Sequence, residues 1–132
     1  MKRAINPFFI FIVVPIMSSC FSLLGDGSNI LVKESANNKH SKKAVLFLRE
    51  AGATVANSYQ VSITDYKTEF DTVTIGNVFT VDDDHGKANL DPKAINFNWV
   101  SDDTIEISYD KDLRTFIQEK NIDGVTIIYK LK

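Results

Sequence analysis

Two places in this chain carry residues that could do chemistry: a cluster of acidic residues and a single cysteine. The cluster is Asp82-Asp83-Asp84-His85-Gly86, where carboxylates precede a glycine as they do in a calcium-binding loop. An EF-hand loop also needs a glycine at its sixth position and a glutamate at its twelfth, and this chain has Lys87 and Lys93 there. The pattern is typical of a solvated loop between strands, and a loose cation site at Asp82, Asp84 and His85 is the alternative.

The rest of the chain offers no arrangement typical of catalysis. There is no Gly-x-Ser-x-Gly motif, and the one cysteine has no second thiol for metal or redox chemistry. Asp102-Asp103 is typical of a turn, and Glu106 falls on the exposed face of an expected strand. We therefore expect no catalytic residue, no metal and no cofactor. A metal-dependent hydrolase that uses the acidic loop is the alternative.

The cysteine, Cys20, follows a segment with the pattern of an export signal. Lys2 and Arg3 precede an apolar run over residues 8–14, and Ser18-Ser19 leads directly into Cys20. This spacing resembles the lipobox of bacterial lipoproteins, although Met17 stands where leucine is most common. The resemblance implies that residues 1–19 are a signal peptide and that Cys20 is lipidated as the mature N-terminus.

The location follows from this reading of the N-terminus. A free lone thiol in an oxidising compartment is a liability, which favours lipidation. An uncleaved membrane helix over residues 4–24 is the main alternative, although Pro15 interrupts it, and an ordinary cleaved signal is a weaker one. The lipobox resemblance implies the bacterial cell envelope, with the domain outside the cytoplasm. Phe21, in place of an aspartate, resembles sorting to the outer membrane if the host is Gram-negative.

The charge of the chain limits the class of partner. It has 15 basic and 17 acidic residues, and loss of Lys2 and Arg3 leaves a formal charge of about −4. The basic residues are scattered, whereas nucleic-acid binding needs them clustered. We expect no nucleic-acid partner, and we expect membrane attachment through acyl chains rather than through charge.

The composition divides the mature chain into two parts. Residues 20–41 are poor in large apolar side chains and are typical of a flexible tether with a reach of about 25 Å, within which Ile30-Leu31-Val32 is a candidate for a brief strand. Residues 42–132 are long enough for one small domain.

Apolar residues in this domain recur with a period of two, which predicts β-strands. The clearest pair covers residues 94–99 and 104–109, joined by Ser101-Asp102-Asp103 in a predicted antiparallel hairpin. Further strands are expected at 59–63, 73–81 with a bulge or bend at Gly76, and 125–131. Asp123-Gly124 predicts a tight turn before the last strand, and hence a partner strand at 115–120; a helix over 112–120 is the alternative.

The remaining apolar pattern indicates how the strands pack. Val45-Leu46-Phe47-Leu48 is apolar on both faces, which is typical of a central strand covered on two sides. The aromatic residues alternate in phase with Ile and Val and are expected in the core rather than on a binding platform. The predicted fold class is all-β: a small antiparallel β-sandwich or barrel-like meander of six to seven strands.

Two segments resemble a known family. They are residues 49–63, with Arg49, Gly52, Ser58 and Gln60, and residues 121–130. Together they resemble an uncharacterised family of short, secreted or lipidated bacterial proteins, a domain of unknown function. The resemblance implies no activity, and Ala51 stands where family members often have a cysteine. From the residues themselves, Arg49, Thr54, Ser58 and Gln60 are polar groups that could converge beside the small-residue loop, with a conformational role.

These observations predict a membrane-anchored envelope lipoprotein with a small non-catalytic β domain. The expected partners are the membrane, through the lipid anchor, and another envelope protein, bound through a strand edge or a loop. A carrier of a lipid or small ligand is a further alternative, if the β layers enclose a cavity.

Overall fold

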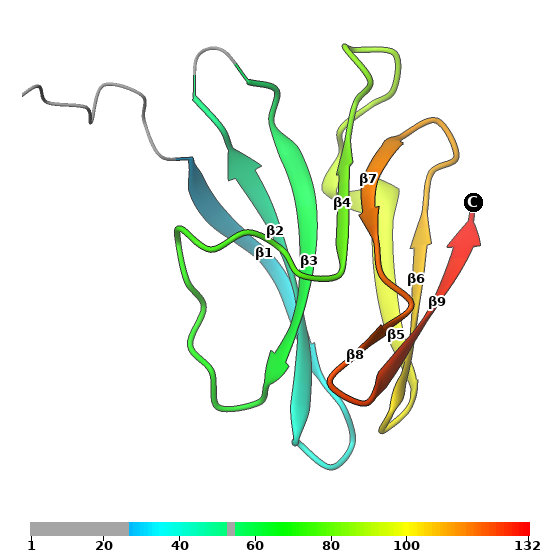
Figure 1. The fold of residues 1–132 in the computed structure, drawn as a ribbon. Coiled ribbons are helices and arrows are strands. Elements are labelled where there is room, and N and C mark those ends of the chain that lie inside the picture. The colour runs from blue at the N-terminus through cyan, green and yellow to red at the C-terminus, as the bar shows by residue number, and fades with distance from the viewer. Residues whose placement is uncertain (1–26, 53–54) are drawn as a thin grey trace, which may run out of the picture.

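The computed structural model describes residues 27–52 and 55–132, which form a two-layer β-sandwich (Figure 1). The first sheet has the order β1-β2-β3-β4-β7, and the second has the order β5-β6-β9-β8. The strands of the first sheet are β1 (Ser28–Ala36), β2 (Lys42–Glu50), β3 (Ser58–Asp65), β4 (Phe79–Asp82) and β7 (Arg114–Gln118). The second sheet contains β5 (Ile95–Ser101), β6 (Thr104–Tyr109), β8 (Asn121–Ile122) and β9 (Val125–Leu131), and a 3-10 turn, η2 (Pro92–Ala94), precedes β5. The all-β class and the sandwich are thus confirmed, but the described residues form nine strands rather than six to seven, and these strands do not close into a barrel.

The core lies between the two sheets and is made of the inward side chains that the period of two predicts. Val61 and Phe79 from the first sheet and Ile105 and Ile107 from the second are fully buried. Phe79 also packs against the ring of Tyr109, with centroids 4.9 Å apart. Burial of each such side chain contributes about 1.5–3 kcal/mol.

Five aromatic residues of the alternating strands belong to this core or border it, as the alternation predicts. Phe97, Tyr59 and Tyr109 are buried, whereas Trp99 and Tyr129 are half-buried at its margin. At that margin each polar tip has a partner: Trp99 Nε1 donates to the Ser35 carbonyl over 2.9 Å, and the Tyr129 hydroxyl donates to the Glu119 carbonyl over 2.6 Å. Burial raises the pKa of Tyr129, which keeps its hydroxyl a donor.

The hairpin of β5 and β6 is confirmed, but the last strand is paired differently from the prediction. Residues 114–118 form a strand rather than a helix, yet β7 pairs with β4 in the first sheet. Asp123 and Gly124 do form the tight turn, with φ of 46° and 79°, and it joins β9 to the two-residue strand β8. Because the chain between β6 and β9 passes through the opposite sheet, β9 returns in the same direction as β6 and the two pair in parallel.

Two other strand predictions need correction. β1 lies within residues 20–41, which the composition assigns to a tether; it pairs antiparallel with β2 from Ser28 against Glu50 to Ala36 against Lys43. Hydrogen bonding to β2 therefore orders a segment whose own composition is weak, and the first strand of the described residues begins at Ser28. Within residues 73–81, only the part from Phe79 onward is a strand. None of the helices in the described ranges has the length and apolar character needed to cross a membrane.

Candidate functional site

The acidic loop is organised around an arginine from a distant part of the chain. Asp82 ends β4 and is 4 % exposed. Its carboxylate accepts hydrogen bonds from Arg114 of β7 on both oxygens, from Nε at 3.0 Å and from Nη2 at 2.6 Å. The Asp84 amide donates to Asp82 Oδ1 as well, over 2.9 Å. The Arg114 guanidinium holds the pKa of Asp82 below its ordinary value, because a bidentate pair stabilises the charged carboxylate.

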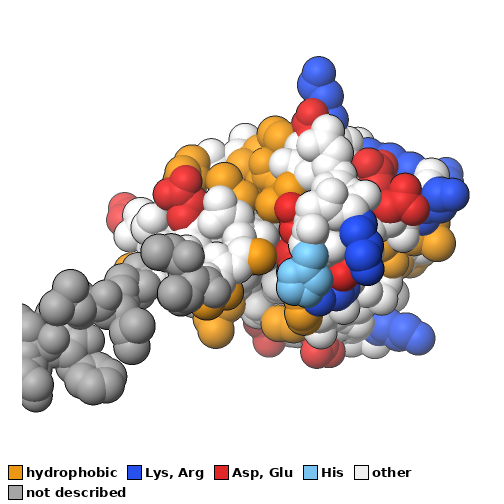
Figure 2. Space-filling model, turned by 90° about the horizontal axis from the view of Figure 1, so that it is seen from above, with side chains coloured by type: hydrophobic (Ala, Val, Ile, Leu, Met, Phe, Trp, Pro, Cys, Tyr) orange, Lys and Arg blue, Asp and Glu red, His pale blue; other side chains and the backbone are white. Residues whose placement is uncertain are grey.

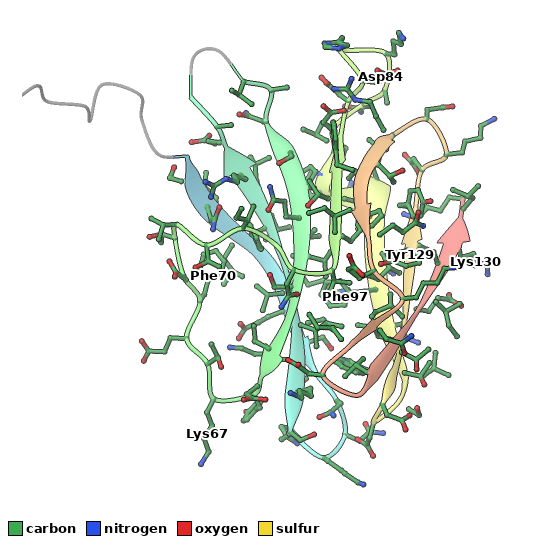
Figure 3. The ribbon with its side chains drawn as sticks, viewed as in Figure 1. Lys67, Phe70, Asp84, Phe97, Tyr129 and Lys130 are labelled. Atoms are coloured by element: carbon green, nitrogen blue, oxygen red, sulfur yellow. The ribbon has the colours of Figure 1, made fainter. Side chains whose placement is uncertain are left out.

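The other two candidate cation ligands face the same guanidinium. Arg114 Nη1 lies 3.6 Å from Asp84 Oδ1 and 3.2 Å from His85 Nε2. Asp84 and His85 have φ of 48° and 60°, so the loop turns tightly at one end of the sandwich (Figure 3). Within the described ranges, no group of three or more His, Cys, Asp or Glu side chains is placed to hold a metal ion. The structure therefore brings Asp82, Asp84 and His85 together around the guanidinium of Arg114 rather than around a metal-ion position.

A second feature lies on the outer face of the first sheet, away from the core. Residues 66–77, here called the covering segment, run from β3 to β4 across this face (Figure 1). Figure 3 shows Phe70 of this segment on the side of the first sheet that faces away from the second sheet. Phe47 of β2 lies beneath it, with ring centroids 5.7 Å apart. The covering segment therefore buries the outer face of β2, as the two-sided apolar run of that strand predicts.

Polar side chains of the sheet hold the covering segment in place. Buried Asn29 donates from Nδ2 to the carbonyls of Asp71 and Thr74, over 3.0 and 2.6 Å. Arg49 Nη1 donates to the Val73 carbonyl and to Asn29 Oδ1, each over 3.0 Å. These bonds satisfy backbone groups that an irregular segment would otherwise leave unpaired.

Gln60 and Gly76 form a further attachment. The Gly76 amide donates to buried Gln60 Oε1 over 2.7 Å, and Gln60 Nε2 donates to Ser58 Oγ over 2.9 Å. A Cβ at Gly76 would lie 2.8 Å from the Gln60 Cβ, so the close approach requires glycine. Arg49, Ser58 and Gln60 thus meet on one face with a conformational role, as the sequence predicts; Thr54 lies outside the described residues.

Between the covering segment and the sheet there is a cavity of about 220 Å³. Its floor consists of two strand pairs, Lys43 beside Thr64 and Val45 beside Ser62, with Phe47 at one end. Its wall consists of Thr68, Glu69, Phe70, Asp71 and Thr74 from the covering segment. The atoms that line it are mainly apolar, as in a binding pocket, although seven of its ten lining residues have a polar or charged side chain.

The polar groups of the cavity differ in how well they are satisfied. The Thr64 hydroxyl is fully shielded from solvent and has no hydrogen-bond partner. Lys43 pairs with Glu34 over 3.3 Å, so its charge is compensated. Thr74 and the Val73 amide donate to Asp71, which lowers the pKa of Asp71 and keeps it anionic. Glu69 is exposed and has no ion-pair partner among the described residues.

The sequence indicates neither the cavity nor Arg114 as the partner of the acidic loop. Arg114 is 32 positions from Asp82, and nothing local to either residue links them. The one usable signal for the cavity is the apolar outer face of β2, which requires a cover. Cys20, the predicted lipidation site, lies outside the described residues.

Comparisons with known proteins leave the family open. No family model, no curated protein and no solved structure matches this chain. The resemblance to an uncharacterised lipoprotein family therefore stays a prediction.

Proposed function

We propose that this chain is a lipid-anchored protein of the bacterial cell envelope whose β-sandwich is a non-catalytic module that binds another envelope protein. The observation that carries the binding role is the cavity on the outer face of the first sheet. A loop that merely covered a sheet would fill the space beneath it, whereas here a fixed segment leaves a mainly apolar cavity and a buried hydroxyl without a partner.

The position of Cys20 supports a role close to the membrane. Ser28, the first residue of β1, is eight positions after Cys20, so the two cannot lie more than about 29 Å apart in any conformation. A lipid on Cys20 would therefore hold the sandwich at the membrane surface. This confinement raises its effective concentration toward other proteins of the same membrane.

The chemistry of the acidic loop supports a binding role over hydrolysis. The Asp82 carboxylate is committed on both oxygens to Arg114, and Asp84 and His85 face the same guanidinium. A metal at this loop would have to displace a paired cation. Figure 2 shows acidic and basic side chains interspersed on the face in view, without a basic patch of the kind that nucleic acids require.

The packing between the sheets also argues against carriage of a ligand inside the sandwich. Inward side chains such as Val61, Phe79, Ile105 and Ile107 are fully buried against one another. The cavity beneath Phe70 lies on the outer face, where a partner has direct access, and a second cavity of about 330 Å³ lies where Val32 and Leu46 of the first sheet approach Ile95 of the second.

Two experiments in the native host test this proposal. Palmitate labelling of the wild type and of Cys20→Ala tests the anchor: we expect label and membrane fractionation for the wild type alone. A photo-crosslinking residue, p-benzoylphenylalanine, at exposed Thr68 of the cavity wall tests the binding role, with the same residue at Lys130 as the control; Lys130 lies on the opposite side of the sandwich (Figure 3).

We expect a discrete crosslinked envelope protein from position 68 and none from position 130. An unlabelled wild type in the cytosolic fraction would refute the anchor. Identical crosslinking from both positions, or none from position 68, would refute binding at this face.

A further inference from the structure

The size of the cavity limits what it can hold. A buried apolar cavity of about 150 Å³ holds a benzene molecule, whereas pockets for drug-sized ligands span about 300–1,000 Å³. At about 220 Å³, this cavity is larger than one benzene ring needs and smaller than a typical metabolite pocket. It matches a single large side chain, such as those that anchor protein–protein interfaces.

The apolar lining favours an aromatic side chain. Phe70 forms one wall and Phe47 one end of the cavity, with an interplanar angle of 60°, and Val45 forms part of the floor. Aromatic rings prefer tilted or edge-to-face neighbours, and such pairs add to the energy gained from burial. A third ring in the cavity would have both phenylalanines as neighbours.

The Thr64 hydroxyl favours an aromatic side chain with a polar atom. This hydroxyl is buried and unpaired, and Thr64 is one of the residues that form the floor of the cavity. Because the hydroxyl is shielded from solvent, the Thr64 side chain has to rotate about χ1 to meet the N–H of an indole or the O–H of a phenol, which then supplies the missing hydrogen bond. Tryptophan and tyrosine carry such groups and are enriched at the centres of interfaces.

The charges around the cavity favour basic neighbours for that aromatic residue. Lys43 is compensated by Glu34, which leaves the exposed carboxylates of Glu69 and Asp71 on the wall. The lowered pKa of Asp71 keeps it charged at neutral pH. Carboxylates at the rim of an apolar pocket attract lysine or arginine and disfavour acidic residues.

We propose that the cavity beneath the covering segment receives a tryptophan or tyrosine side chain from a basic segment of the partner protein. The aromatic ring packs beside Phe47 and Phe70, its polar atom pairs with the rotated Thr64 hydroxyl, and flanking lysine or arginine residues face Glu69 and Asp71. This proposal rests on the binding function proposed above and names the chemistry of the partner.

Short peptides test this proposal by NMR titration of the backbone amides of the purified protein. The probes are acetyl-Lys-Trp-Lys-amide, its Glu-Trp-Glu and Lys-Ala-Lys counterparts, and free tryptamine. We expect the Lys-Trp-Lys peptide to shift the amides around Val45, Ser62 and Thr64 and to bind at least about tenfold more tightly than the other three probes, a factor that corresponds to about 1.4 kcal/mol.

Three variants connect the binding to the cavity. Ser62→Leu fills the floor, and Ser108→Leu is its matched control, a half-buried serine of β6 outside the cavity lining. Phe70→Ala removes a wall without changing a strand. We expect Ser62→Leu and Phe70→Ala each to weaken Lys-Trp-Lys binding about tenfold or more, and Ser108→Leu to leave it unchanged.

The outcomes separate this proposal from the function on which it rests. Equal binding of Lys-Ala-Lys, or unchanged binding by both Ser62→Leu and Phe70→Ala, overturns the aromatic docking. Equal binding of tryptamine assigns the cavity to a free aromatic amine and overturns the partner segment. If position 68 crosslinks a partner but no peptide binds, the docking chemistry fails alone; if the peptide binds and no crosslink forms, the proposed function fails alone.

Discussion

The ion pair between Arg114 and Asp82 allows us to predict how much its removal lowers the free energy of unfolding and how that change depends on pH. In Arg114→Met the Asp82 carboxylate stays 4 % exposed and keeps one donor, the Asp84 amide, after losing two guanidinium hydrogen bonds. Breaking a fully buried pair costs about 3–5 kcal/mol. Because the Arg114 side chain is 37 % exposed, solvent screens part of the interaction. We therefore expect Arg114→Met to lower the free energy of unfolding by about 2–3 kcal/mol at pH 7. That loss corresponds to a fall in Tm of about 8–12 °C at about 4 °C per kcal/mol.

The dependence on pH follows from the direction of the pKa shift. In the wild type the folded-state pKa of Asp82 is lowered, so its contribution is complete above an unfolded-state pKa of about 3.9 and is lost as the pH falls through the lower folded-state value. In Arg114→Met, burial without the guanidinium raises the pKa of Asp82 instead. Protonation of Asp82 then removes the buried charge. The difference in free energy of unfolding between the wild type and Arg114→Met is therefore largest at pH 7 and shrinks toward pH 3.

Urea denaturation followed by circular dichroism at pH 7 and pH 3 measures both effects. Lys42→Met is the control, because its partner Asp65 is 74 % exposed and such pairs contribute about 0–1 kcal/mol. This account of the acidic loop would be refuted if Arg114→Met lowers the free energy of unfolding by less than about 1 kcal/mol at pH 7, or if it lowers it equally at both pH values.

Three further changes test other parts of the structure. Gly76→Ala places a Cβ 2.8 Å from the Gln60 Cβ and is expected to cost about 1–3 kcal/mol in urea denaturation; an unchanged midpoint would contradict the close approach. Thr80→Val removes the second buried hydroxyl that has no partner and is expected to raise stability by about 1 kcal/mol in the same assay, so a loss would show that the hydroxyl is satisfied. Trp99→Phe removes the hydrogen bond from the indole to the Ser35 carbonyl. We expect it to lower the free energy of unfolding by about 1 kcal/mol and to speed hydrogen exchange of the β1 amides. Unchanged exchange would show that Trp99 does not stabilise that strand.

The parts of the fold that the sequence predicts are those that local information specifies. The β5–β6 hairpin has two clean periods of two and a short polar turn, so the pairing of the two strands follows directly, although its register shifts between Trp99 and Ser101. The turn at Asp123-Gly124 is equally local. β7 is recognised as a strand, but its sheet is fixed by Arg114 meeting Asp82 on β4, and this contact spans 32 positions.

The same distinction explains the correction at β1. Ile30-Leu31-Val32 is the only apolar run between Gly25 and Lys42, and its neighbours are mostly small or polar. Pairing with β2 stabilises the strand in a hairpin, and so do the hydrogen bonds of Asn29 to the covering segment, which span 42 and 45 positions. A segment that depends on such contacts is typical of a tether when it is read by composition alone.

The sequence predicts part of the candidate site for a related reason. Arg49 and Ser58 stand opposite each other in the β2–β3 register, and Gln60 lies two residues on, so their convergence is local. The sequence predicts the acidic loop as a cluster, but the cation that pairs with Asp82 is Arg114, which only the fold brings next to it. The cavity depends on the path of residues 66–77, which have no periodic pattern.

The cavity itself follows from how a sheet face is covered without a third layer of secondary structure. Val45 and Phe47 make the outer face of β2 apolar, so some part of the chain must shield it. An irregular segment can do so only where polar side chains such as Asn29, Arg49 and Gln60 satisfy its backbone, and those anchors fix its height above the sheet. With the height of the segment fixed, Phe70 packs against the Phe47 ring, and the space beside it stays open. Filling that space should therefore leave the fold intact while it abolishes binding, which is why Ser62→Leu separates a pocket selected for a partner from a packing defect.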